Sequence, residues 1–178
     1  FAAGDISVNM GDFDGIADEA VVSGALVAAG ALRLSNRGTG AFALKLAGAR
    51  LQAGAGGLLL ETGDAADAVT LTDATLTSAG AMRLDFGGGA DVVAISVGSL
   101  TATEGHSLLS GAGAVWATVQ GASLSGKTVS LDMGEGDDLL ILSDLAGLHG
   151  AATVLGGAGL DEVQIIRLPA QRAGDTLT

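Results

Sequence analysis

The chain has 178 residues, of which 48% are hydrophobic but only 3% aromatic, and it carries a net charge of −12 with eight Lys and Arg residues. So few basic residues disfavour nucleic acid as a partner, because phosphate contacts need Lys and Arg. The absence of Cys excludes disulfides and thiolate metal sites. No apolar run approaches the ~20 residues of a membrane span, so we expect no membrane insertion.

The chain opens inside a repeating unit. Residues 6–10 alternate apolar and polar and run into Gly11, as residues 82–86 run into Gly87. We therefore expect residues 1–10 to complete an earlier coil. We interpret residues 1–178 as a single segment cut from a longer repeat protein, since the first residue is not Met.

The first full coil is expected over residues 11–37, with Val21, Leu26 and Leu34 facing inward. An acidic stretch, DFDGIADE, precedes its first strand. Asp12, Asp14 and Asp18 are spaced around a glycine there and resemble a short calcium loop without the full EF-hand pattern. The alternative is an acidic surface excursion.

From residue 38 onward one unit recurs. Its first nine residues read GTGAFALKL, GDAADAVTL, GGGADVVAI, GAGAVWATV, GEGDDLLIL and GAGLDEVQI in the six copies. The copies begin at Gly38, Gly63, Gly87, Gly111, Gly134 and Gly157, so successive spacings are 25, 24, 24, 23 and 23 residues. A fixed period in this range is typical of repeat architectures, in which each unit packs only on its neighbours.

Three positions of each unit are regularly aliphatic. Eight residues after the first glycine the copies carry Leu46, Leu71, Ile95, Val119, Leu142 and Ile165. Thirteen residues after it they carry Leu51, Leu76, Leu100 and Leu124, with Leu148 substituting in the next copy. Twenty or twenty-one residues after it they carry Leu59, Leu84, Leu108, Leu131 and Val154. One coil therefore offers three inward-facing sets.

These patterns favour strands over helices. Apolar residues alternate with period two, and an interior glycine, which recurs throughout each unit, costs about 1 kcal/mol in a helix. The sequence predicts an all-β fold: a right-handed parallel β-helix, or β-solenoid, of about seven coils of 23–25 residues with three strands per coil.

Most acidic residues flank the turn that joins the third strand of one coil to the first strand of the next. Four residues after the turn glycine, Asp67 and Asp91 occupy adjacent coils, and Asp138 and Asp161 do so again. Stacked coils would hold such carboxylates about 5 Å apart, which is unfavourable unless a cation intervenes. Calcium is the natural candidate. The alternative is that these side chains cap turn amides in solvent.

The segments GGGADVVAI and GEGDDLLIL resemble the calcium-binding nonapeptide of repeats-in-toxin proteins. The resemblance implies calcium ligation by Asp91, Asp138, Asp161 and Asp67. From the pairing of acidic turns we expect two calcium clusters, one at Asp67 and Asp91 and one at Asp137, Asp138 and Asp161. It departs from that family because the nonapeptides are not in tandem, and the turns at Gly38 and Gly111 lack acids. As a whole the chain looks closer to the β-solenoid repeat regions of large secreted bacterial surface proteins and adhesins, which implies an extracellular or cell-surface location.

An enzyme is not expected. His106 and His149 are interpreted as surface loop residues, and Arg83 or Lys127 as a lyase base would need a cleft that no long loop builds. Trp116 occupies the position that neighbouring coils fill with Val92 or Leu139. It either packs in the core or lies on an exposed face without a binding role, or it serves as a platform on which a sugar ring stacks. We expect a structural or adhesive segment that self-associates or packs on neighbouring coils of the same fibre. A carbohydrate-binding module, with glycans as partners, or a polysaccharide lyase is the alternative.

Overall fold

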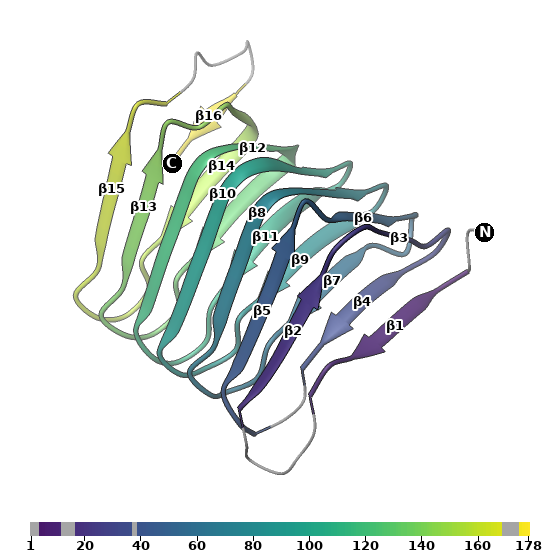
Figure 1. Cartoon of the computed structure of the whole chain (residues 1–178). Coiled ribbons are helices and arrows are strands. Elements are labelled where there is room, and N and C mark those ends of the chain that lie inside the picture. Colours follow the sequence, from purple (N-terminus) through teal and green to yellow (C-terminus); the bar gives the residue numbers. More distant parts are fainter. Residues whose placement is uncertain (1–3, 12–16, 37–38, 169–174) are drawn as a thin grey trace.

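The computed structural model describes residues 4–11, 17–36, 39–168 and 175–178. It confirms the β-solenoid: all strand pairs are parallel, about seven turns are stacked, and the described residues contain no helix. In Figure 1 the coils follow one another along the stack, from β1 and β2 at the purple end to β15 at the yellow end.

Each turn of the solenoid contributes to three faces. The first face holds β2 (Asp18–Val22), β5 (Phe42–Ala47), the starts of β8 (Ala68–Ser78), β10 (Asp91–Ala102) and β12 (Val115–Asp132), then β13 (Leu139–Ser143) and β15 (Glu162–Ile166). The second holds β3 (Ala25–Val27), β6 (Arg50–Ala53), the later parts of β8, β10 and β12, and the start of β14 (Gly147–Leu155). The third holds β1 (Ile6–Asn9), β4 (Leu32–Ser35), β7 (Leu58–Glu61), β9 (Ala81–Asp85), β11 (Gly105–Leu109), the ends of β12 and β14, and β16 (Thr176–Leu177).

The corner between the first and second faces is made by one residue in the left-handed backbone region in each coil. These residues are Gly24, Gly48, Asp73, Val97, Gly121, Asp144 and Arg167, with φ between 50° and 89°. A single residue of this conformation turns the chain without a loop. In β8, β10 and β12 the strand continues through this corner, although the pairing skips the corner residues Asp73, Val97 and Gly121. By contrast, β5 and β6 are separate strands on either side of Gly48.

The core is the stack of aliphatic columns predicted from the repeat. In the first column Leu46, Leu71, Ile95, Val119 and Leu142 are buried and lie directly on one another, and in the second column Leu124 does pair with Leu148. Ile165 continues the first column but is 44% exposed, because no described coil covers it. Stacked identical positions let small and branched side chains fill most of a thin coil, and among the described residues Phe42 and Phe86 are the aromatic members of the core.

Two of the expected inward residues are wrong by one position. Val21 pairs with Lys45 and is exposed, and Val22 takes its place over Leu46. Leu59 lies between two arginines, and Leu60 is the buried residue that pairs with Leu84. The reason is the same in both coils: corner lengths differ by one or two residues, and a shift of one residue turns a strand side chain to the opposite face.

The interpretation of the histidines is also wrong. His106 lies on β11, pairs with Met82 and Val129 in an inward column, and is only 2% exposed. Neither ring nitrogen has a hydrogen-bond partner among the described residues. Burial lowers the pKa of His106 to about 4, so the ring is neutral in the core. His149 lies on β14, half-buried, with Nδ1 3.2 Å from Asp175 Oδ2.

Candidate functional site

The corner between the third and first faces carries the acidic residues. The position four residues after the turn glycine forms one column, and parallel pairing stacks Asp18, Phe42, Asp67, Asp91, Val115, Asp138 and Asp161 along it in successive coils. The structure thus brings Asp67 next to Asp91, and Asp138 next to Asp161, as the spacing predicted. Val115 separates the two pairs.

The carboxylates of this column point inward, which the sequence analysis did not anticipate. Asp67, Asp91 and Asp138 are almost fully buried, Asp18 is half-buried, and Asp161 is exposed at the last described turn. A signal was available: Phe42 and Val115, the apolar members of the column, occupy the same position in the two turns that lack acids. An apolar residue in a repeat column indicates that the column faces the core.

Each buried carboxylate caps a backbone amide of the preceding coil. The N–H of Phe42 donates to Asp67 Oδ1 at 2.8 Å, and that of Asp67 donates to Asp91 Oδ1 at 2.9 Å. Val115 N–H donates to Asp138 Oδ1 at 2.7 Å, and Asp138 N–H to Asp161 Oδ1 at 3.2 Å. Phe42 and Val115 are the first residues of β5 and β12, and Asp67 and Asp138 directly precede β8 and β13. The carboxylates therefore do cap backbone amides, as the alternative to calcium binding states, but from buried positions and not in solvent.

The second oxygen of two of the three buried carboxylates lacks a hydrogen-bond partner among the described residues. Asp67 Oδ2 accepts the N–H of Gly63 at 3.0 Å, whereas Asp91 Oδ2 and Asp138 Oδ2 are buried and have no hydrogen-bond partner among the described residues. Burial raises the pKa of Asp91 to about 7, with the charge of Asp67 adding to the rise and the hydrogen bond from Asp67 N–H opposing it. Near neutral pH a share of Asp91 is therefore protonated.

Burial also raises the pKa of the other two buried carboxyls. For Asp67 the amides of Phe42 and Gly63 oppose the rise. For Asp138 the hydrogen bond from Val115 N–H opposes it, and the charges of Asp161 and Asp137 reinforce it. The column therefore contains three buried carboxyl groups with raised pKa values, and each accepts a hydrogen bond from a backbone amide of the adjacent coil.

The glycines of this turn allow successive turns to approach closely. A Cβ on Gly157 would lie 1.6 Å from the carbonyl oxygen of Gly134, and one on Gly87 would lie 1.9 Å from that of Gly63. Both residues have positive φ, 100° and 65°. A side chain at either position would force the stacked turns apart, so these glycines hold the coil spacing at the corner.

The remaining predicted metal ligands lie on the outer side of the corner or outside the described residues. Asp137 is exposed, and its Oδ1 accepts the N–H of Leu160 on the next turn at 2.9 Å. Asp64 binds the next turn in the same manner through Gly88 N–H at 3.3 Å. Asp12 and Asp14 fall outside the described residues, and Asp18 begins β2.

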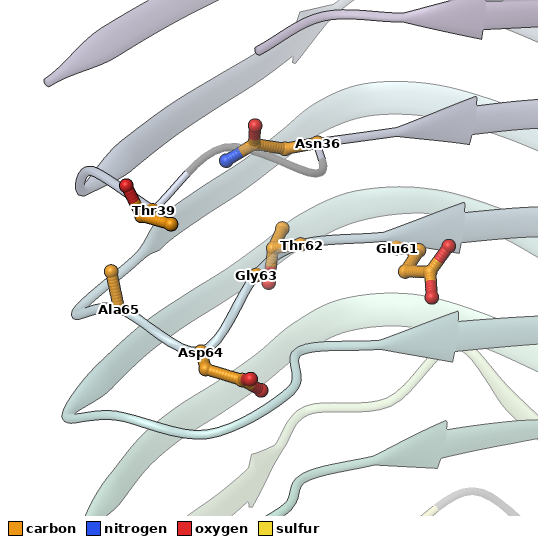
Figure 2. Close-up of a pocket in the computed structure, with 7 residues that line it drawn as sticks. All are labelled: Asn36, Thr39, Glu61, Thr62, Gly63, Asp64 and Ala65. Carbon is orange, nitrogen blue, oxygen red and sulfur yellow. The ribbon is translucent and has the colours of Figure 1, made fainter. Parts of the chain in front are cut away.

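A hollow of about 430 Å³ at this corner lies between the turn after β4 and the turn after β7. Figure 2 shows Asn36 and Thr39 on the first turn and Thr62 to Ala65 on the second. Glu61 lies toward the strand and Asp64 toward the next coil, so their carboxylates do not converge on one point in the hollow.

Within the described part of the chain, no three His, Asp or Glu side chains gather as a metal-binding group. The inward carboxylates supply one or two oxygens per turn and use one of them for a backbone amide, whereas calcium takes six to eight oxygens. Calcium binding stays a prediction for this corner, and its ligands would come from Asp91 Oδ2, Asp138 Oδ2 and turn carbonyls.

The residues considered for lyase chemistry lie on the third face and its edges. Arg83 Nη2 is 2.6 Å from Asp85 Oδ2, and Lys127 Nζ is 2.6 Å from Glu104 Oε2. The four side chains belong to two separate surface ion pairs, and the two cations are fixed by neighbouring acids.

No helix capable of spanning a membrane occurs in the described ranges. Comparison of the chain with protein-family models, with curated proteins and with solved structures gives no match.

Proposed function

We propose that this chain is a structural and adhesive segment of a secreted bacterial surface or matrix fibre, which associates end to end with copies of itself or packs on neighbouring coils of the same fibre. The observation that carries the proposal is the state of the last described first-face strand. β15 pairs with β13 on one side only, and its core residues Val163 and Ile165 are 41% and 44% exposed. In the preceding coils the same columns are closed by the next strand.

A further coil would complete both the ladder and the core. The open edge of β15 presents unpaired backbone groups, which template the pairing of another strand. At the other end β2 presents Ala20 and Val22 in the same two columns, beginning with Asp18 in the column of capping carboxylates. A neighbouring coil, from the same fibre or from a second copy, would continue these columns head to tail.

Other features support an extended fibre outside the cell. Its turn sequences resemble the repeats-in-toxin nonapeptide, and the chain as a whole resembles the β-solenoid repeat regions of large bacterial surface proteins. Calcium in the acidic corner would stiffen the stack by linking adjacent turns.

The test is a concentration series in sedimentation velocity, with electron microscopy of the associated fraction. The chain should form elongated end-to-end particles, and Ile165→Lys should suppress them, because the charge would have to be buried on stacking. Val92→Lys, on an exposed lateral strand position, is the matched control and should associate normally. A chain that stays monomeric at high concentration, or that loses association equally in both variants, would contradict the proposal.

A further inference from the structure

The only tryptophan of the chain lies on an exposed sheet face. Trp116 points outward from β12 and is 58% exposed. It stacks between Val92 on the coil before and Leu139 on the coil after. In the flanking coils the same position is Ala68 on one side and Glu162 on the other. Val92, Trp116 and Leu139 therefore form a short apolar strip across three strands, which we call the Trp116 strip.

A shallow hollow of about 300 Å³ lies beside this strip, between it and the acidic corner. Ala90 and Ala114, on the turns that lead into β10 and β12, line it and are too small to fill the space next to the indole. Asp137 lines the same hollow from the following turn. Asp91, which is buried, lines it as well. The site therefore combines an exposed aromatic face, an apolar surround and two carboxylates, of which that of Asp137 is exposed.

The carboxylate of Asp137 is held in place by a hydrogen bond, and its negative charge disfavours an anionic ligand. Its Oδ1 accepts the N–H of Leu160 at 2.9 Å, which fixes the group at the edge of the hollow. No Lys or Arg lines this hollow. An anionic ligand would meet only negative charge, whereas a neutral ligand that carries hydroxyl groups could donate to Asp137.

The size of the strip excludes a protein partner. Strands in a sheet are about 4.8 Å apart, so three side chains span roughly 10–15 Å, and a stable protein interface needs about 800 Å² per partner. A second copy would also bring another 12 negative charges to this face. A ligand with one flat apolar face and a polar edge, the size of a single ring, matches the strip and the hollow.

We propose that the Trp116 strip binds a neutral pyranose ring of a glycan chain, with the C–H face of the sugar on the indole and a ring hydroxyl donating to Asp137. This site lies on the side of the rod and goes beyond the structural role, so it does not depend on end-to-end association. A rod of this kind would bind a polysaccharide along its flank while its ends join further coils.

The test uses the tryptophan as its own reporter, because the chain has no other. The probes are the hexasaccharides of chitin, cellulose, xylan and amylose, titrated to about 10 mM, which would nearly saturate a site with a Kd of about 1 mM. At least one probe should shift or quench Trp emission in a saturable manner. Polygalacturonate is the anionic comparison and should bind at least tenfold more weakly. Tighter binding of polygalacturonate than of every neutral probe would overturn the assignment.

Isothermal titration calorimetry with a probe that changes Trp emission then tests which residues bind the ligand. Trp116→Ala should abolish the binding heat, and Asp137→Asn should weaken binding about tenfold, the loss expected for a hydrogen bond to a charged group. Thr75→Ala, on the second face, should bind like the parent chain, and urea unfolding checks that each variant folds. The proposal is overturned if no probe changes Trp emission, if Trp116→Ala binds as well as the parent, or if Trp emission shifts with protein concentration alone, which would mean that a second copy covers the strip.

Discussion

The buried histidine makes a quantitative prediction about acid stability. His106 occupies a column otherwise filled by Leu58, Met82 and Val129, and both of its ring nitrogens are without partners in the described part of the chain. Its pKa is lowered to about 4 from an ordinary value of 6.5. Between these values the unfolded chain binds a proton that the folded chain does not, so the stability contributed by His106 is lost as pH falls. Replacement by methionine, the residue of the coil before, removes this loss.

The magnitude follows from the two pKa values. The free energy of unfolding of the parent relative to His106→Met should fall by about 2 kcal/mol between pH 7.5 and pH 5.0. His106→Met should already be more stable at pH 7.5 by about 1–3 kcal/mol, because it removes an unpartnered N–H donor from the core. The range stops at pH 5.0 to stay above the isoelectric point near 4.2.

The assay is urea unfolding followed by far-ultraviolet circular dichroism at each pH, for the parent, His106→Met and Ser107→Met. Ser107 is the next residue on β11 and does not face the core, so its variant should track the parent at every pH. Asp91 titrates in the opposite sense, and only the difference between parent and variant isolates His106. A difference that stays constant from pH 7.5 to pH 5.0 would refute the reasoning, because it would mean that the ring is protonated as easily in the folded state as in the unfolded one.

Three further predictions concern the two corners of the coil. Asp91→Asn should raise stability at pH 8 and show a smaller advantage at pH 5, because the parent carboxyl has a raised pKa and its folded state is destabilised as pH rises from about 4 to 7; equal pH profiles in urea unfolding would count against it. Val97→Asn should stabilise by about 1 kcal/mol, since Val97 is a β-branched residue at φ 50° and more than half exposed. Val92→Asn, exposed but without positive φ, should not stabilise, and a gain there of the same size would remove the explanation. Calcium at a hundredfold excess over its Kd should raise stability by about 2.7 kcal/mol, with reversal by chelator and a smaller gain in Asp138→Ala; an unchanged melting temperature would leave the carboxylates as amide caps alone.

The sequence by itself determined the solenoid, because its signals are local and repeated. A glycine turn every 23–25 residues and a period of two between turns specify strands that recur at a regular spacing. Parallel stacking then follows, since only a neighbouring coil can bury the aliphatic columns. The adjacency of Asp67 with Asp91 and of Asp138 with Asp161 came from the same count.

The tertiary structure alone decided which way several side chains face. Corner length varies by one or two residues, and that variation exchanged Leu59 for Leu60 and Val21 for Val22. For His106 and the capping aspartates, the polar residue type led us to expect exposed side chains, but the structure buries them. Each of these buried residues has at least one apolar neighbour in its column, so the column predicts burial better than the side chain does. The left-handed corner could not be read from its residues either, because Gly, Asp, Val and Arg share it and only the closure of each coil requires the conformation.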